Sequence, residues 1–442
     1  MPKFQPPRGT RDFMPEDMSR RQYVLDTFRR VFESFGFRPM DTPAFESWEL
    51  LSKKGGGGEG IKDEIYYFKD KSDRELGLRF DLTVPLARVA AGNPQLQLPF
   101  KRYQISKVWR YDRPQAGRMR EFVQADSDIV GTAGMEADAE CIAVAVEALR
   151  ALGFRKLEVR LNNRKILNAL VESVNIPGKK APEVFRILDK TGKAPRSEII
   201  GELKRSGIDA GRVTKLMKLI DVSGAPEKTL PRIGRMLAGI GTAEDGTRGL
   251  EQIVTIAKSY GIDKCIKIDL SLVRGLEYYT GPIFEVSAKA KRQVGSVAGG
   301  GRYDNLIEMY GGKPTPATGI SFGIERIFEV MCAENMFAEV KPKTSVFVVS
   351  VNDDAAVRGE SIVIAQKLRS SGVDAETDLM GRDLRKQLDY ANRRQIPFVL
   401  IVGPDEMKTG RFTMKEMKTG REKKAGLENL VKKLKDETGI TS

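Results

Sequence analysis

Two long alternating segments within residues 100–131 constrain the fold more than any other part of the chain. Phe100–Trp109 and Met119–Ile129 each repeat with a period of two residues, which is typical of strands, and a turn at Pro114–Gly117 separates them. They therefore predict an antiparallel hairpin with a long loop. Alternation places one set of side chains on a single face of the second strand, namely Arg118, Arg120, Phe122, Gln124, Asp126 and Asp128.

That face combines cationic, aromatic, amide and carboxylate groups, which would suit ATP together with an amine-bearing substrate. The alternative is an exposed edge hairpin with ordinary ion pairs. Phe122 stands in the middle of the polar set and favours a binding face.

A second constraint lies at Leu272–Glu285. An alternating segment, Cys265–Leu270, leads into it, and Ile283–Val286 has the composition of a further strand, so the sequence predicts a hairpin. Arg274 and two adjacent tyrosines stand between these strands. A guanidinium keeps its charge and suits carboxylates and phosphates. These residues alone leave two interpretations open, a ligand-binding hairpin and a strand pair with a surface arginine.

The chain of 442 residues contains no histidine. This excludes Ser-His-Asp and Cys-His nucleophile systems, histidine metal sites and imidazole acid–base chemistry. An enzyme of this composition must work through arginines, carboxylates and tyrosines, with or without magnesium. Phosphoryl or nucleotidyl transfer fits best, because positioning and charge neutralisation supply most of the catalysis there.

Net charge, apolar content and cysteine use indicate the kind of partner and the cell compartment. The formal net charge of +14 favours a polyanionic partner such as nucleic acid, although a basic balance can also serve solubility alone. No apolar run approaches the ~18 residues of a membrane span. The N-terminus lacks the apolar core of a signal peptide, and the three cysteines form no CxxC pair. We expect a cytoplasmic protein with free thiols and no membrane association.

The residue pattern changes character along the chain. Residues 1–163 mix strands and helices, residues 164–260 form a succession of short helical patterns with Gly and Pro breaks, and residues 261–338 return to strands. After a linker near Lys341–Lys343, residues 343–442 follow a strand–helix–strand order, which predicts a parallel-rich sheet covered by helices. The predicted fold class is α/β, with a helical insertion between the two halves of an α+β core and a separate C-terminal α/β domain.

Three short motifs leave alternatives open. Ala298–Gly301 fits neither a Rossmann fingerprint nor a P-loop, but it permits close approach of the backbone to a ligand or to another strand. Asp81 and Thr83, at a strand-to-helix junction, form either a polar cluster or a helix N-cap. Gly55–Gly58 is either a plain linker or a loop that orders over a ligand.

Together these residues resemble a known family. The extended segment Phe37–Pro43, the arginine-bearing hairpin Trp109–Phe122 and the strand–helix junction Gly323–Arg326 resemble the three motifs of class II aminoacyl-tRNA synthetases. Leu272–Thr280 (LVRGLEYYT) and Gly300–Asp304 (GGRYD) closely resemble the two signature segments of histidyl-tRNA synthetases. The resemblance covers nearly the whole chain, with an antiparallel catalytic sheet flanked by helices and an anticodon-binding domain at residues 343–442.

The resemblance implies roles for the matching residues. Arg110 would contact the α-phosphate of ATP and Arg118 the γ-phosphate end, while Phe122 and Arg326 would lie on either side of the adenine. Arg274 would lie between the substrate carboxylate and the α-phosphate, a place that a magnesium ion often takes in related enzymes. Arg110 and Arg274 would be the catalytic residues.

A histidine site is implied around Arg274. Asp81, Gln124 and Asp128 would hold the ammonium group, and Tyr279 and Tyr303 would line the imidazole pocket. Thr83 and Tyr278 complete the implied set. Many bacterial members carry glutamate at the positions of Asp81 and Asp128, so this chain resembles the archaeal and eukaryotic branch instead; the charge is the same.

The implied activity is ATP-dependent attachment of L-histidine to tRNA(His) through a histidyl-adenylate, by a homodimer that uses ATP and Mg²⁺. The sequence does not indicate metal-binding residues. The alternative is a non-catalytic, synthetase-like regulatory subunit of ATP phosphoribosyltransferase in histidine biosynthesis. Such proteins usually lack the C-terminal domain and lose the ATP-binding arginines, whereas this chain keeps both.

Overall fold

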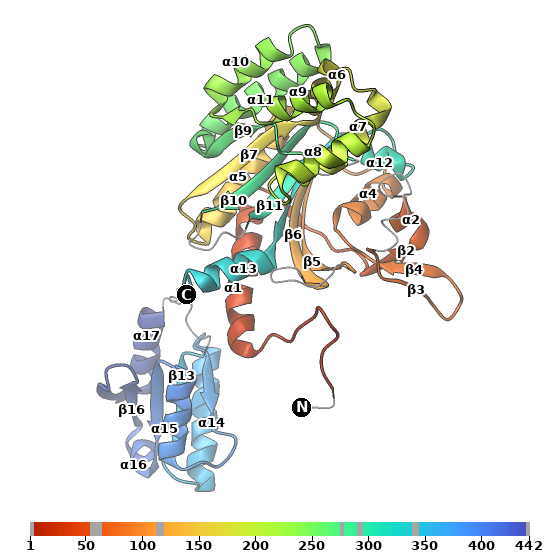
Figure 1. The fold of residues 1–442 in the computed structure, drawn as a ribbon. Coiled ribbons are helices and arrows are strands. Elements are labelled where there is room, and N and C mark those ends of the chain that lie inside the picture. Colours follow the sequence, from red (N-terminus) through yellow and green to blue (C-terminus); the bar gives the residue numbers. More distant parts are fainter. Residues whose placement is uncertain are drawn as a thin grey trace. The chain divides into compact units, whose positions relative to one another are not determined.

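The computed structural model describes residues 4–53, 64–111, 119–274, 278–289, 295–337 and 344–438. Its internal contacts divide the chain into two compact units, residues 1–338 and residues 339–442, each built on its own large sheet (Figure 1). The boundaries predicted inside the first unit, at residues 163 and 260, stay predictions. Among the described residues, no helix is both long and apolar enough to cross a membrane.

The first unit is organised around the predicted hairpin. Its two strands, β5 (Phe100–Trp109) and β6 (Glu121–Val130), are antiparallel and pair along their full length, with Phe100 opposite Val130 and Trp109 opposite Glu121. Seven more strands extend the sheet: β1 (Arg38–Pro39), β7 (Leu157–Asn163), β8 (Ser223–Gly224), β9 (Ile266–Asp269), β10 (Pro282–Ala288), β11 (Ser296–Arg302) and β12 (Ala317–Gly323). The strand order is β1-β5-β6-β12-β11-β10-β7-β9-β8, and only the pairs β1–β5 and β7–β9 are parallel.

The predicted hairpin between the strands on either side of Arg274 is wrong. Strand β7 lies between β9 and β10, parallel to the first and antiparallel to the second. Alternation predicts which face a strand presents but not which strand is its neighbour. The connection between Asp269 and Pro282 is long enough to pass one strand spacing of ~4.8 Å.

Helices cover one face of the large sheet, and an aromatic cluster fixes them there. The covering helices include α1 (Pro15–Ser34), α5 (Met135–Ala151), α11 (Gly241–Ser259) and α13 (Ile324–Ala333). The rings of Phe28 and Phe32 in α1 lie 4.7 and 6.0 Å from the ring of Phe322 in β12. Because successive side chains of a strand point to opposite faces, the neighbours of Phe322 in β12 belong to the other face of the sheet.

The helical segment predicted between the two halves of the sheet is present, and it lies at one end of the first unit (Figure 1). Besides α11 it contains α6 (Arg164–Ser173), α7 (Ala181–Leu188), α8 (Arg196–Arg205), α9 (Ala210–Ile220) and α10 (Pro226–Met236). The apolar pattern predicts helices at Leu230–Leu237 and Leu250–Tyr260, whereas α10 and α11 begin earlier, at Pro226 and Gly241, because their first turns are mostly polar.

A small three-stranded sheet leads into the candidate site. Its strands are β2 (Phe45–Ser47), β3 (Tyr67–Lys69) and β4 (Glu75–Leu78), in the order β2-β4-β3. Helix α2 (Trp48–Ser52) packs on β4, and α4 (Thr83–Gly92) follows β4 in the chain and contacts α12 (Leu306–Met309).

The C-terminal unit confirms the predicted strand–helix–strand order. Its sheet has the order β14-β13-β15-β16-β17, parallel in the first three strands and antiparallel in the last two. The strands are β13 (Val346–Ser350), β14 (Ala375–Thr377), β15 (Phe398–Val402), β16 (Arg411–Glu416) and β17 (Glu422–Gly426), and the helices are α14 (Ala355–Ser370), α15 (Leu384–Arg393), α16 (Pro404–Thr409) and α17 (Leu427–Thr438).

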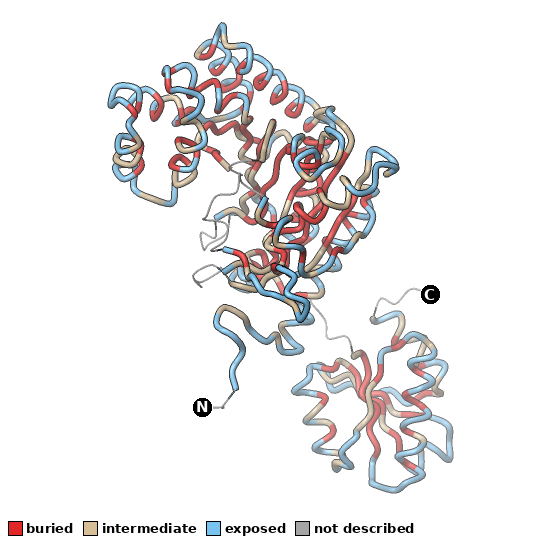
Figure 2. Tube along the Cα trace, turned by 90° about the vertical axis from the view of Figure 1, so that its right-hand side faces the viewer, coloured by how far each residue is buried: buried red, intermediate tan, exposed pale blue. Residues whose placement is uncertain are grey.

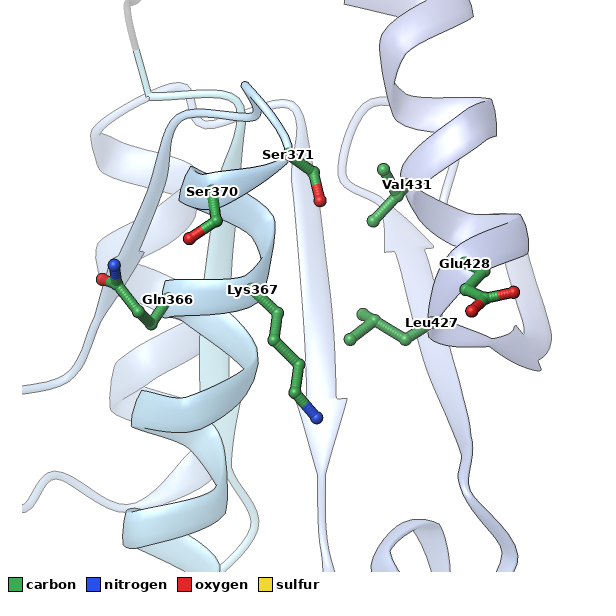
Figure 3. A pocket seen from close by; sticks show the side chains of 7 residues that line it. All are labelled: Gln366, Lys367, Ser370, Ser371, Leu427, Glu428 and Val431. Carbon is green, nitrogen blue, oxygen red and sulfur yellow. The ribbon is translucent and has the colours of Figure 1, made fainter.

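Burial follows the sheets in both units, with most sheet strands buried and the outer turns of the helices exposed (Figure 2). In the C-terminal unit a surface hollow of about 460 Å³ lies between α14 and α17, lined by Lys367, Leu427 and Val431 among others (Figure 3). It contains none of the predicted site residues.

Glycines in β11 allow the middle of the large sheet to close. A Cβ atom on Gly300 would lie 2.0 Å from the carbonyl oxygen of Gly319 and 2.8 Å from the Cα of Ile320, so the neighbouring backbone leaves no room for a side chain. The glycine tract is therefore a strand that approaches another strand closely, which is one of the alternatives that the sequence left open.

We predict that Gly300→Ala lowers the free energy of unfolding by about 3 kcal/mol, because the clash is with backbone atoms that cannot turn away. Gly234→Ala is the matched control: it lies in α10, where an added Cβ would meet open space among the described residues, and it should be neutral or stabilising by up to about 1 kcal/mol. Thermal unfolding of both variants beside the wild type measures this. Equal stability of the two variants would contradict the close approach.

Candidate active site

The face of the large sheet opposite the helices carries two rows of aligned residues. Strand register places one residue from each of six neighbouring strands in the central row, which comprises Gln104, Asp126, Ser321, Gly299, Glu285 and Arg160. The adjacent row comprises Arg102, Asp128, Gly319, Gly301, Ile283 and Asn162. Polar groups therefore occupy both ends of the rows and glycines the middle, where the side chains of Arg274 and Asp128 lie against Gly299 and Gly319.

Asp128 lies in a buried ion pair at one end of the second row. Its Oδ2 lies 2.8 Å from Nη2 of Arg102, and its Oδ1 accepts a hydrogen bond from the hydroxyl of Tyr303. Arg102 is fully buried and also donates to the carbonyl of Leu82 at 3.0 Å. Burial raises the pKa of Asp128, against the opposing effect of Arg102. Gly319 stands opposite Asp128 because any Cβ there would collide with Oδ1.

Asp126 is the next carboxyl on the same face. Its hydrogen-bond partner is Ser321, whose hydroxyl in turn accepts from the amide Nε2 of Gln124. Burial raises the pKa of Asp126 to about 7, although Arg102 acts in the opposite direction. Within the described part of the chain, Oδ1 of Asp126 and Oε1 of Gln124 are buried and have no hydrogen-bond partner.

Helix α4 begins at Thr83 and its N-cap residue is Leu82, which makes no side-chain cap bond; Asp81, one residue earlier, bonds to the first turn instead. The Asp81 Oδ1 accepts a hydrogen bond of 3.1 Å from the backbone N–H of Val84. Asp81 is also buried, and its charge contributes to the raised pKa values of Asp126 and Asp128. It therefore belongs to the same acidic cluster.

Arg274 lies above the glycine strand, held by a carboxylate. Its Nε and Nη2 lie 3.0 and 2.8 Å from Oε1 of Glu285. The other carboxylate oxygen of Glu285, Oε2, accepts a hydrogen bond of 3.0 Å from Nη1 of Arg160. Nε of Arg160 in turn donates to Asp269 at 2.8 Å. A Cβ on Gly299 would lie only 2.3 Å from Nη1 of Arg274, so the guanidinium rests directly on this glycine.

Two further arginines approach this region. Nε of Arg110 donates to the carbonyl of Phe80 at 3.0 Å, and its guanidinium lies 5.2 Å from the ring centroid of Phe122. Nη1 of Arg326 donates a hydrogen bond of 3.0 Å to the backbone carbonyl of Ser296. The hydroxyl of the same serine accepts a hydrogen bond of 3.4 Å from Nη2 of Arg274. Arg326 and Arg274 therefore share one residue as an anchor.

The tyrosines predicted for the site lie together. The rings of Tyr278 and Tyr279 are 4.6 Å apart, and the ring of Tyr303 lies 6.1 Å from that of Tyr278. Burial raises the pKa of all three phenols, so they are neutral hydrogen-bonding groups at pH 7. Arg118 lies outside the described residues, as does the glycine segment Gly55–Gly58.

Sequence reasoning missed several residues that hold this site in place. Arg102, Ser321 and Glu285 were not singled out, although the alternation of Phe100–Trp109 already placed Arg102 on one face with Gln104. The signature residue Arg302 lies on the other, helix-covered face, where its Nε donates to Asp138 of α5 at 3.1 Å. Its role is structural.

Family models match both units of the chain. Residues 9–327 match the model described as histidyl-tRNA synthetase, and residues 345–437 match the model described as anticodon binding domain. The chain belongs to the histidyl-tRNA synthetase family.

Curated relatives in this family match the chain over nearly its full length. The histidine–tRNA ligase of Thermococcus kodakarensis is 36% identical over 441 residues and covers 100% of both chains. That of Aeropyrum pernix is 42% identical over 412 residues, with 93% of each chain covered. Gloeobacter violaceus has a ligase that is 39% identical, covering 95% of this chain and 96% of its own.

Solved structures share the fold of the family. Histidyl-tRNA synthetase from Nostoc has a TM-score of 0.85 and 29% identity, covering 99% of this chain and 100% of its own. A protein of Bacillus halodurans, described as ATP phosphoribosyltransferase regulatory subunit/histidyl-tRNA synthetase, has a TM-score of 0.74 and 23% identity, covering 88% of this chain and 96% of its own. At that identity the second likeness shows the fold alone.

The position of Arg274 above Gly299 gives a sharp test. Gly299→Ala should displace the guanidinium rather than the backbone, because the clash is with the end of a flexible side chain. We predict a fall of about ten- to a hundredfold in histidine-dependent ATP–pyrophosphate exchange, with little change in melting temperature. Gly234→Ala is the control and should leave exchange unchanged. An exchange rate in Gly299→Ala equal to that of the wild type would show that the position of Arg274 does not affect the reaction.

Proposed function

We propose that this protein attaches L-histidine to tRNA(His) in two steps, through a histidyl-adenylate. The observation that carries the proposal is a buried acidic cluster on the same sheet face as Arg274, with Arg110 bonded to Phe80 and Arg326, from the start of α13, bonded to Ser296 beside Arg274. The acidic cluster suits the ammonium group of an amino acid, and the arginines suit carboxylate and phosphate groups. The full-length relatives named histidine–tRNA ligase support the choice of amino acid.

In the first step, a carboxylate oxygen of histidine attacks the α-phosphorus of ATP in line. A new P–O bond forms, the bond to the β-phosphate oxygen breaks, and pyrophosphate leaves with the electron pair. Arg110 and Arg274 stabilise the negative charge on the non-bridging oxygens of the α-phosphate. The pairing of Arg274 with Glu285 orients the guanidinium before substrate arrives.

In the second step, a ribose hydroxyl of the 3′-terminal adenosine of the tRNA attacks the carbonyl carbon of the adenylate. The ester bond to the tRNA forms, and AMP leaves. None of the described site residues is an evident general base, so a phosphate oxygen of the adenylate takes the proton in this proposal.

The other site residues bind the two substrates, ATP and histidine. Arg118 and Arg110 bind the phosphates of ATP, and Phe122 and Arg326 enclose the adenine. The histidine side chain lies against the neutral tyrosines, with the ammonium group in the acidic cluster. The histidine site comprises Asp81, Thr83, Gln124, Asp128, Arg274, Tyr278, Tyr279 and Tyr303.

The proposed reaction also requires Mg²⁺ and tRNA(His). Mg²⁺ enters with the phosphates of ATP, its usual ligands in such sites; among the described residues no group of three or more His, Cys, Asp or Glu side chains could hold a metal ion by itself. Residues 343–442 bind the anticodon of tRNA(His). The protein works in the cytoplasm as a homodimer, with Phe37–Pro43 at the subunit interface.

The regulatory-subunit alternative is less well supported. The relatives from Thermococcus kodakarensis and Aeropyrum pernix, which match nearly the full chain, are histidine–tRNA ligases. The chain also keeps the anticodon-binding unit and the arginines expected at ATP, of which Arg110, Arg274 and Arg326 are in the described site.

Arg274→Lys tests the mechanism. The substitution keeps the charge but removes the planar fork that contacts Glu285 with two nitrogens. We expect single-turnover formation of histidyl-adenylate to slow by about a hundredfold or more. Arg196→Lys is the control, because Arg196 makes a two-nitrogen contact with Asp221 at an exposed position.

The same preparation tests the function as a whole. Wild-type protein with ATP and labelled histidine should form an adenylate that can be trapped without tRNA and transferred to a tRNA(His) transcript. An adenylate rate near wild type in Arg274→Lys would remove Arg274 from the mechanism. Absence of charging, with tight binding to an ATP phosphoribosyltransferase catalytic subunit, would favour the regulatory alternative.

A further inference from the structure

Glu325, the second residue of α13, is a buried carboxylate at the end of a central strand of the large sheet. Strand β12 ends at Gly323, which lies opposite Gln124 of β6. One residue earlier in β6, the backbone N–H of Val123 donates to Glu325, and its nitrogen lies 3.1 Å from each carboxylate oxygen. Since a buried backbone N–H needs an acceptor, the carboxylate serves as one at the point where β12 no longer can.

Arg21 of α1 provides the opposite charge. Its Nη2 donates to Oε1 of Glu325, and the two residues are 4% and 7% exposed. The guanidinium also lies 4.3 Å from the ring centroid of Phe13, which precedes α1. Helices α1 and α13 lie side by side next to β6 (Figure 1). Because a buried carboxylate is costly unless it is paired and hydrogen-bonded, Arg21 and Val123 together hold the side chain of Glu325 between these elements.

The neighbours of this contact are the two side chains proposed to enclose the adenine. Phe122 precedes Val123 in β6, and Arg326 follows Glu325 in α13. Because strand side chains alternate, Val123 faces the helices while Phe122 faces the proposed active site. The Glu325 carboxylate therefore joins the backbone that carries Phe122 to the helical turn that carries Arg326.

The distance between Phe122 and Arg326 decides whether a base can lie between them. A planar ring in contact on both faces needs its neighbours roughly 7 Å apart, twice the contact distance of two carbon atoms. An extra gap of about 0.5–1 Å forfeits roughly a quarter to a half of the attraction on that face. The spacing therefore benefits from a contact that spans both elements, and the hydrogen bond between Val123 and Glu325 is such a contact.

We propose that Glu325 and Arg21 are positioning residues for the nucleotide, which set the distance between Phe122 and Arg326 without touching the substrate. The alternative is a purely structural ion pair, which would affect stability alone. Buried ion pairs contribute little net stability, because the cost of removing both charges from water offsets their attraction. This inference rests on the proposed function, because it takes ATP as the ligand whose adenine lies between Phe122 and Arg326.

Glu325→Gln tests the proposal. The substitution keeps an acceptor for the N–H of Val123 but removes the charge that faces Arg21. We expect ATP to bind about tenfold more weakly, which corresponds to the loss of one stacking contact. The affinity for L-histidine should stay within about twofold, because L-histidine has no adenine and Gln124 of its proposed site is fixed separately through Ser321. Isothermal titration calorimetry measures both.

Two further variants show whether Arg21 and Glu325 act together. Arg21→Met should weaken ATP binding by a similar factor, because Glu325 loses its anchor. The double variant Arg21→Met/Glu325→Gln should bind ATP no more weakly than either single variant, since the two residues act as one unit. The double variant buries no unpaired charge, so it decides the question if a single variant does not fold.

Asp138→Asn is the control for a structural effect. It removes another buried ion pair on the helix-covered face, that of Asp138 with Arg302. It should lower the melting temperature and leave the affinity for ATP unchanged. A loss of ATP affinity in this control equal to that in Glu325→Gln would overturn the proposal.

Other results would also overturn it. These are unchanged ATP affinity in Glu325→Gln, an equal loss for ATP and L-histidine, and losses that add in the double variant. If no variant folds, a structure of the wild type with ATP decides, and an adenine that does not lie between Phe122 and Arg326 overturns the proposal.

Failure of the proposed function would give a different result. Wild-type protein that binds both ligands but shows no histidine-dependent ATP–pyrophosphate exchange would overturn the proposed function alone. Wild-type protein that does not bind ATP would overturn the proposed function and this inference together.

Discussion

The structure depends on how buried charge is balanced on one face of a sheet. Away from water, each carboxylate or guanidinium needs a partner, or its protonation state shifts. Two groups of residues meet this need in different ways. Arg274, Glu285, Arg160 and Asp269 are buried or partly buried and form an alternating chain in which each charge contacts an opposite one. In the second group, Asp81, Asp126 and Asp128 are buried near one arginine, Arg102, and burial raises the pKa of Asp126 and of Asp128. The first group fixes an arginine in place, and in the second a shifted protonation state lowers the cost of burying carboxyls together.

The opposite face of the same sheet provides the rigidity. Phe28 and Phe32 of α1 pack on Phe322 of β12, and Arg302 is tied to Asp138 of α5. Because strand residues alternate, Phe322 and Ser321 are neighbours in sequence with separate tasks, one in the core and one in the hydrogen-bond relay to Asp126. The glycines of β11 serve both faces: Gly300 permits close packing of the backbone, and Gly299 leaves space for Arg274.

Local pattern was enough to predict much of this arrangement. Alternation predicted β5 and β6 and the face shared by Gln124, Asp126 and Asp128, and resemblance to family motifs supplied Arg110, Arg274 and Arg326. Sequence could not show that β7 separates β9 from β10, because strand neighbours are set by packing far along the chain. Glu285 gave no signal, since an acidic residue in a strand is usually exposed.

We propose that this face of the sheet binds histidine beside ATP and joins the two. ATP–pyrophosphate exchange, run separately with each of the twenty amino acids, tests it most directly, because exchange requires both substrates in one site and a reversible bond between them. We expect exchange with histidine to be at least a hundredfold faster than with any other amino acid. Absence of exchange with histidine, or equal exchange with another amino acid, would contradict it.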